Sequence, residues 1–117
     1  MLPHNRLCAA GLWIAMFDSF APTYDADFTQ SPIARHLRAR VHARLDRLCA
    51  PGDSVLELGC GTGEDALYLA RRGVRVLATD ASEAMLSVAR AKLADYANAC
   101  VERLDLREVG KANVADA

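Results

Sequence analysis

Hydrophobic residues recur every three or four positions after residue 31, which is the spacing of a helix that buries one face. Ser31 is a favoured helix-capping residue, and Pro32 suits the first turn of the helix that follows. The turn formed by residues 50–53, "APGD", ends this segment. The apolar positions of the helical segment are Ile33, Leu37, Val41, Leu45 and Leu48. We therefore predict an amphipathic helix that is packed against another part of the fold.

Two further segments show the same spacing. The first covers 64–72 and stops at Gly73, a residue typical of helix ends. The second covers 83–96 and follows Ser82, which is placed to cap it. Their apolar positions are Leu67 and Ala70 in the first, and Met85, Leu86, Ala89 and Leu93 in the second. We expect both segments to be helices that lie on a common core.

Short apolar runs precede or follow these helices at 55–58, 74–79 and 99–104. Runs of this length that are bounded by turn residues predict strands. Strands that alternate with helices indicate an α/β fold, a Rossmann-like doubly wound parallel sheet with right-handed crossovers. Ligands of such sheets bind at the carboxyl ends of the strands. A glycine-rich turn follows the first strand at this end, and an aspartate follows each of the other two.

The composition fits a single globular domain. The chain has 117 residues, 52% of them hydrophobic and 25% charged, which argues against disorder and allows one modest core. Its 14 basic residues are balanced by 15 acidic residues, for a net charge of -1. A basic surface for nucleic acid is therefore not expected.

The cysteines and histidines predict no metal site. The four cysteines, Cys8, Cys49, Cys60 and Cys100, form no C-x-x-C pair, and the histidines have no metal-ligand spacing. We interpret His36 and His42 as surface residues of the first helix. Cys60 lies in the glycine-rich turn, but no histidine near it in sequence offers a base, which favours a small packed thiol over a nucleophile. Reduced cysteines predict a cytoplasmic protein.

The N-terminal run at 7–17, "LCAAGLWIAMF", has the length of a signal-peptide core and is too short to span a bilayer. No Ala-x-Ala site follows it directly, and Met16 is a plausible alternative start. We favour an amphipathic or buried segment, or an upstream extension, over secretion. No membrane partner is expected. The predicted organisation is an N-terminal extension and lead-in segment at 1–30, followed by the α/β part at 31–117.

The stretch "VLELGCGTG" at 55–63 carries the main chemical signal. Its glycines allow a tight turn and let backbone N–H groups approach a ligand. A dinucleotide fingerprint would have glycine where Glu64 stands, and Glu57 would repel a pyrophosphate but suits a cation. Asp80, after the second strand, is placed to accept hydrogen bonds from two ribose hydroxyls. A cationic nucleoside without phosphates describes S-adenosylmethionine.

On these residues the chain resembles the class I S-adenosylmethionine-dependent methyltransferases. "VLELGCGTG" resembles the first motif of the family, "LATDAS" contains its second-strand acid, and "LDLRE" resembles the segment whose aspartate approaches the adenine. The stretch "FDSFAPTYD" at 17–25 is similar to the N-terminal region of small-molecule methyltransferases related to the quinone-biosynthesis C-methyltransferases.

The resemblance implies roles for ten residues. Glu57, Gly59, Cys60, Gly61 and Gly63 line the methionine end of the cofactor, Asp80 holds the ribose, Ser82 and Met85 flank the adenine, Asp105 caps its amino group and Tyr24 covers the site. The implied reaction is methyl transfer to a small-molecule acceptor. No catalytic base is assigned, because no histidine or tyrosine is tied to an acceptor pocket.

The family's sheet has seven strands in the order 3-2-1-4-5-7-6, whereas this sequence predicts about three. We therefore expect a shortened chain, in which 31–117 is the N-terminal half of an S-adenosylmethionine-binding methyltransferase domain and keeps most of the cofactor motifs. The strand at 55–58 then becomes an apolar edge, which predicts self-association. Two other interpretations stay open: a non-enzymatic Rossmann-like binding or assembly module and, less favoured because of Glu57 and Glu64, a nicotinamide-dependent oxidoreductase.

Overall fold

The computed structural model describes residues 21–108. The apolar run at 7–17, the alternative start at Met16 and the cysteine Cys8 lie outside the described residues. Within 21–108, no helix combines the length and the apolar character needed to cross a membrane.

The helices begin where the sequence predicts. Helix α2 (Pro32–Leu48) is capped by Ser31, whose Oγ accepts a hydrogen bond from the Ala34 N–H at 3.2 Å. Helix α3 (Glu64–Arg71) follows the glycine-rich turn directly. Helix α4 (Glu83–Leu93) is capped in the same way as α2, by the Ser82 Oγ and the Met85 N–H. It ends earlier than the predicted residue 96, because the chain turns there to enter the next strand.

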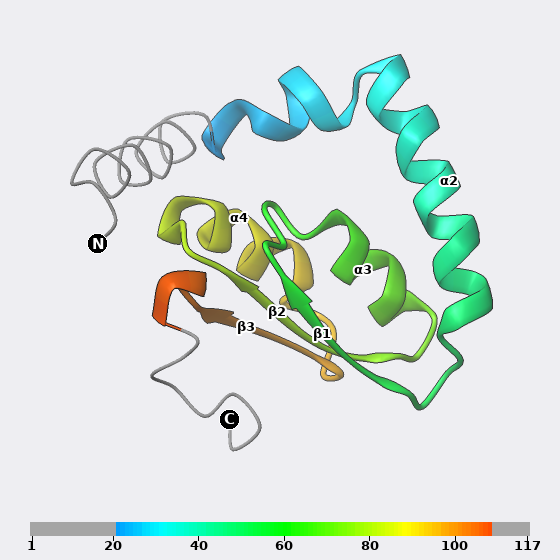
Figure 1. Ribbon diagram of the computed structural model, residues 1–117. Coiled ribbons are helices and arrows are strands. Elements are labelled where there is room, and N and C mark those ends of the chain that lie inside the picture. The colour runs from blue at the N-terminus through cyan, green and yellow to red at the C-terminus, as the bar shows by residue number, and fades with distance from the viewer. Residues whose placement is uncertain (1–20, 109–117) are drawn as a thin grey trace, which may run out of the picture.

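Three strands form one parallel sheet in the order β1-β2-β3. They are β1 (Ser54–Leu58), β2 (Arg75–Asp80) and β3 (Ala99–Arg103). The predicted parallel α/β sheet is therefore confirmed, with each strand boundary within one residue of its expected position. Helices α3 and α4 cover one face of the sheet, and β1 lies at its edge among the described residues (Figure 1).

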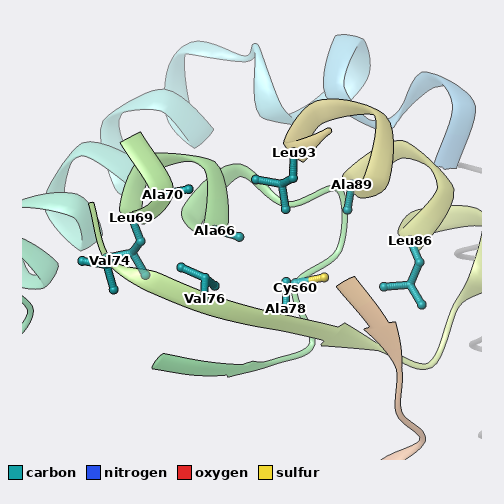
Figure 2. Close-up of a cluster of buried hydrophobic side chains, with 10 residues drawn as sticks. All are labelled: Cys60, Ala66, Leu69, Ala70, Val74, Val76, Ala78, Leu86, Ala89 and Leu93. Atoms are coloured by element: carbon teal, nitrogen blue, oxygen red, sulfur yellow. The ribbon is translucent and has the colours of Figure 1, made fainter. Parts of the chain in front are cut away.

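The hydrophobic core lies between that face and the two helices (Figure 2). It consists of Cys60, Ala66, Leu69, Ala70, Val74, Val76, Ala78, Leu86, Ala89 and Leu93, each less than a tenth exposed. The side chains of β1 alternate between the two faces of the sheet. Val55 packs against the core, whereas Leu56 and Leu58 are 44% and 52% exposed. The described core is thus one-sided.

Helix α2 was expected to pack its apolar face against the rest of the fold, but most of that face is exposed. Only Leu45 of that face packs against the core. Ile33, Leu37, Val41 and Leu48 are between 46% and 74% exposed. The helical period was read correctly, but within the described chain α2 is packed mainly against α3 and against the segment that precedes α2. Nothing within 21–108 covers the greater part of its apolar stripe.

Candidate cofactor-binding site

The glycine-rich turn connects β1 to α3. Gly61 has a φ of +56° and Gly63 a φ of +86°, a region that side chains disfavour. A Cβ on Gly61 would meet nothing within 4 Å, so this glycine serves backbone conformation and leaves open space beside it. A Cβ on Gly63 would lie 3.1 Å from the Ala89 Cβ of α4. Gly63 therefore also allows α3 to approach α4 closely.

Asp80 fixes this turn. Its Oδ2 accepts a hydrogen bond from the Gly61 N–H at 2.8 Å, and its Oδ1 accepts one from the Ser82 N–H at 2.9 Å. The Cys60 N–H donates to the Thr79 carbonyl at 2.8 Å, which ties the turn to β2. Each carboxylate oxygen of Asp80 accepts one such bond and has a lone pair left for a ligand.

A hollow of about 360 Å³ lies at these strand ends and is lined by Tyr24, Gly59, Gly61, Asp80 and Met85. The structure thus brings five of the ten predicted residues together around one cavity. Its volume falls within the range of small-molecule sites. A larger hollow, about 550 Å³, lies on the uncovered face of the sheet. We assign the site to the smaller one, because only there do the glycine-rich turn and Asp80 converge.

Glu57 lies in β1 just before the turn. Its Oε2 is buried and has no hydrogen-bond partner within residues 21–108. Burial, together with the nearby charges of Asp65 and Asp80, raises the pKa of Glu57 to about 7, although Arg38 acts in the opposite direction. A carboxylate with an unpaired buried oxygen is poised to accept a cationic group. This feature fits the positive charge of the predicted cofactor.

Cys60 is buried at the start of the turn. Burial, followed by the negative charges of Glu57 and Asp80, raises the pKa of its thiol to about 12. The nucleophilic form of cysteine is the thiolate, which this environment disfavours. Packing against the core therefore explains the residue better than nucleophilic catalysis does.

Ser82 and Asp105 have structural partners of their own. The Ser82 hydroxyl caps α4, and the residue is 3% exposed. Asp105 is also buried, and Arg107 binds both of its carboxylate oxygens. Hydrogen bonds from the Arg107 side chain and backbone lower the pKa of Asp105 to about 2. The predicted contacts of Ser82 and Asp105 with the adenine remain predictions.

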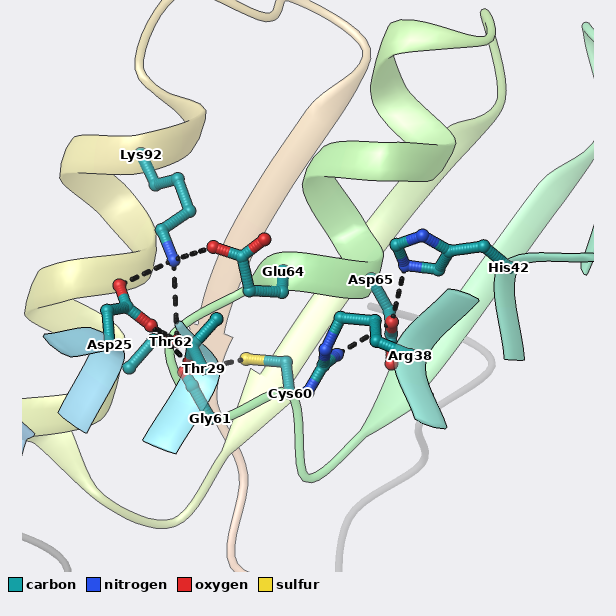
Figure 3. A network of polar contacts seen from close by, with 10 residues as sticks. All are labelled: Asp25, Thr29, Arg38, His42, Cys60, Gly61, Thr62, Glu64, Asp65 and Lys92. Carbon is teal, nitrogen blue, oxygen red and sulfur yellow. Dashed lines mark hydrogen bonds and ion pairs between the residues drawn. The ribbon is translucent and has the colours of Figure 1, made fainter. Parts of the chain in front are cut away.

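A polar network that the sequence did not predict lies at the glycine-rich turn (Figure 3). It joins Asp25 and Thr29 of the π-helix η2 (Asp25–Thr29) to Thr62, Glu64 and Lys92. Asp25 belongs to the stretch "FDSFAPTYD", and this stretch was the only feature of the sequence that pointed to Asp25. Lys92 is 67 positions from Asp25 in the sequence, and no local pattern distinguishes it from other lysines.

His42 is not the surface residue that the sequence predicts. Its side chain is 19% exposed, its Nε2 lies 2.9 Å from the Asp65 Oδ1, and its ring stacks on Tyr68 with centroids 3.8 Å apart. Arg38 binds the same Asp65 oxygen at 2.7 Å. These contacts arise where α2 runs beside α3. His36, by contrast, is exposed as expected.

Comparisons with known proteins show to which family the chain is similar. Residues 55–116 match the family model described as "Methyltransferase domain". Demethylmenaquinone methyltransferase from Clavibacter sepedonicus is 39% identical over 82 residues, which cover 68% of this chain and 33% of that protein. A 2-phytyl-1,4-naphtoquinone methyltransferase from Synechococcus elongatus is 37% identical over 90 residues, 74% of this chain and 38% of that protein.

Among solved structures, a DhpI–SAH complex superimposes with a TM-score of 0.59 at 30% identity. The match covers 80% of this chain and 43% of the DhpI chain. The chain spans between 33% and 38% of the length of the two relatives named above. Since the family model matches more than half of its residues, the chain belongs to the methyltransferase domain family.

Proposed function

We propose that the chain binds S-adenosylmethionine and forms part of a methyltransferase that acts on a small-molecule acceptor. One observation carries the proposal: five predicted residues line one cavity at the strand ends. The buried Glu57 Oε2, which has no hydrogen-bond partner within residues 21–108, lies in the strand that leads to this cavity and supports the proposal. Family membership and the similarity to two quinone methyltransferases support the reaction and the acceptor class.

The chain's own residues provide binding and orientation. Asp80 is proposed to hold the ribose through the lone pairs that its two backbone bonds leave free. Glu57 is proposed to hold a cationic part of the cofactor, and Tyr24 to exclude water from above. The remaining predicted contacts, through Cys60, Gly63, Ser82 and Asp105, are proposed on resemblance alone.

The bound cofactor would supply an activated methyl group on a sulfonium. Little covalent chemistry is then required of the protein, and alignment of the acceptor with that methyl group carries most of the catalysis. We assign no general base. His42 is already engaged with Asp65 and Tyr68.

The proposal extends to setting and organisation. We place the protein in the cytoplasm, which fits the free state of Cys49, Cys60 and Cys100. Residues 1–30 are proposed as an extension and lead-in segment, and 31–117 as the N-terminal portion of the cofactor-binding domain. Self-association through β1 is also proposed, supported by the exposure of Leu56 and Leu58.

Calorimetric titration of the chain with S-adenosylmethionine, S-adenosylhomocysteine and NAD tests the cofactor. We expect both adenosyl compounds to bind and NAD not to bind. Asp80→Asn should weaken binding at least about tenfold, because one charge-assisted acceptor is replaced by an amide. Asp53→Asn, at the turn before β1, is the matched control and should bind normally. NAD binding without binding of either adenosyl compound would exclude the proposal in favour of an oxidoreductase.

A further inference from the structure

The lead-in segment, residues 21–30, is pinned to the glycine-rich turn by a polar network that we call the latch. Asp25 Oδ1 accepts hydrogen bonds from the Thr62 hydroxyl at 2.6 Å and the Thr29 hydroxyl at 2.8 Å. Asp25 Oδ2 accepts one from the Lys92 Nζ at 2.7 Å. The same ammonium group donates to the Glu64 Oε1, also at 2.7 Å (Figure 3). One lysine therefore joins three parts of the fold.

The latch is shielded from solvent. The side chains of Lys92, Glu64 and Asp25 are 15%, 24% and 28% exposed. The other ion pair of α4, Arg90 with Glu83, has side chains that are 46% and 58% exposed. Ion pairs that are shielded from water are screened less, and loss of one partner leaves an uncompensated charge. The latch should therefore hold its parts more firmly than the exposed pair does.

The latch lies next to the cavity without lining it. Tyr24, which lines the cavity, directly precedes Asp25, and Thr62 directly follows the lining residue Gly61. Ala21, at the other end of the segment, is 2% exposed, and η1 (Ala21–Thr23) packs against α4. The latch thus sets the position of the backbone that carries Tyr24.

We propose that Lys92 is a positioning residue that holds the lead-in segment, and with it Tyr24, over the cofactor cavity before any ligand binds. The identity of the ligand in this inference rests on the proposed function. The closure of the segment over the cavity does not. Lys92 is a single cation between two carboxylates. Its removal leaves Asp25 and Glu64 facing each other, so its loss opens the segment more than the loss of either acid does.

Hydrogen exchange of the full chain without ligand tests the closure directly. The Gln30 N–H, which donates to the Asp25 carbonyl at 2.8 Å, reports on the lead-in segment. In Lys92→Met we expect its exchange to accelerate on the order of tenfold, while amides of β2 keep their protection. Lys92→Arg keeps the charge and should retain most of the protection. Unchanged exchange at residue 30 in Lys92→Met would overturn the proposal.

Matched controls separate closure from general damage. Arg90→Met removes a cation from the same helix, and Asp27→Asn removes an exposed acid from the same π-helix. Both should leave residue 30 protected. If Lys92→Met also loosens β2, Asp25→Asn replaces it as the test, since that variant keeps the pair between Lys92 and Glu64. Protection of residue 30 in Asp25→Asn that equals the wild type would then refute the latch.

A titration with S-adenosylhomocysteine connects the latch to the site. Lys92→Met should bind about tenfold more weakly than the wild type, and Lys92→Met combined with Asp25→Asn should recover part of the loss because the facing charges are removed. Absence of binding in the wild type itself would contradict the proposed function, while the exchange result would still decide whether the latch closes. Equal affinity in wild type and Lys92→Met would show that closure does not serve this ligand.

Discussion

The strand-end region, with its glycine-rich turn, and the β1 edge belong to the same small sheet. They differ in how much of each region is held or covered by other residues of the described chain. At the strand ends, Asp80 ties the glycine-rich turn in place, and the latch fixes the segment above it. At the edge, Leu56 and Leu58 are about half exposed and β1 has a single partner strand within 21–108. The first region is held by contacts that these residues make among themselves. The second presents apolar surface that a partner would bury.

The difference shows that the core beneath the strand ends is built mainly from elements that follow one another in the sequence. The turn, α3, β2 and α4 follow one another and supply the buried core residues, to which β1 adds the partly buried Val55. Exposed apolar side chains, by contrast, lie on β1 at Leu56 and Leu58 and along the stripe on α2. Stability and binding should therefore respond to mutations in the first region and association to mutations in the second.

The largest effect is expected from a cavity in the core. Leu86 is fully buried, and Leu86→Ala should lower the free energy of unfolding by roughly 2–5 kcal/mol because buried contacts are lost and a void remains. Leu58 is 52% exposed, so Leu58→Ala is the matched control and should change the free energy of unfolding by less than about 1 kcal/mol. Urea denaturation at low protein concentration measures both. Equal losses would contradict the comparison, since they would place Leu58 in a packed environment.

Most of the fold could be predicted from the sequence because its signals are local. Ser31, Ser82 and Gly73 marked helix ends, and alternating helices and strands indicated a parallel sheet. The glycine-rich turn and Asp80 were found by spacing. The exposure of the α2 stripe could not be predicted, because periodicity identifies an apolar face and not what covers it. Lys92 could not be identified either, since it meets Asp25 only through the tertiary fold.

A second prediction concerns Glu57, which lies where the two regions meet. Its pKa is raised from 4.5 to about 7, so the native state favours the protonated carboxyl. That stabilisation is complete below about pH 4.5 and is lost as the pH rises through 7. The shift corresponds to at most ~3 kcal/mol. Without ligand, Glu57→Gln should therefore match the wild type at pH 4.5 and exceed it in stability at pH 8.

Thermal unfolding at several pH values measures this difference. Glu102→Gln on β3, an exposed acid, serves as the control and should unfold like the wild type across the range. Glu57→Gln should also bind S-adenosylhomocysteine more weakly at pH 8, because it cannot carry the negative charge proposed to hold a cation. A variant that is less stable than the wild type at pH 8 would mean that the ionised Glu57 has a partner and is not the unpaired group described above.

The smallest effect is expected at the β1 edge. Two copies of β1 can pair antiparallel around a two-fold axis that places Leu56 opposite Leu56 and Glu57 opposite Val55, so no like charges face each other. The exposed leucines of the two strands would then lie on one continuous face. We expect the chain to associate with rising concentration in light scattering. Leu56→Lys should weaken association at least about tenfold, because two ammonium groups would then oppose each other across the axis.

The control for this variant is Leu106→Lys, which adds the same charge at a leucine that is 59% exposed and lies outside the sheet. It should associate like the wild type. If both lysine variants dissociate equally, net charge and not strand pairing governs the association. If Leu56→Lys alone becomes monomeric while its cofactor affinity and urea midpoint stay unchanged, association belongs to the edge and binding to the strand ends. A wild-type chain that stays monomeric at all concentrations would instead show that the exposed edge does not recruit a second copy.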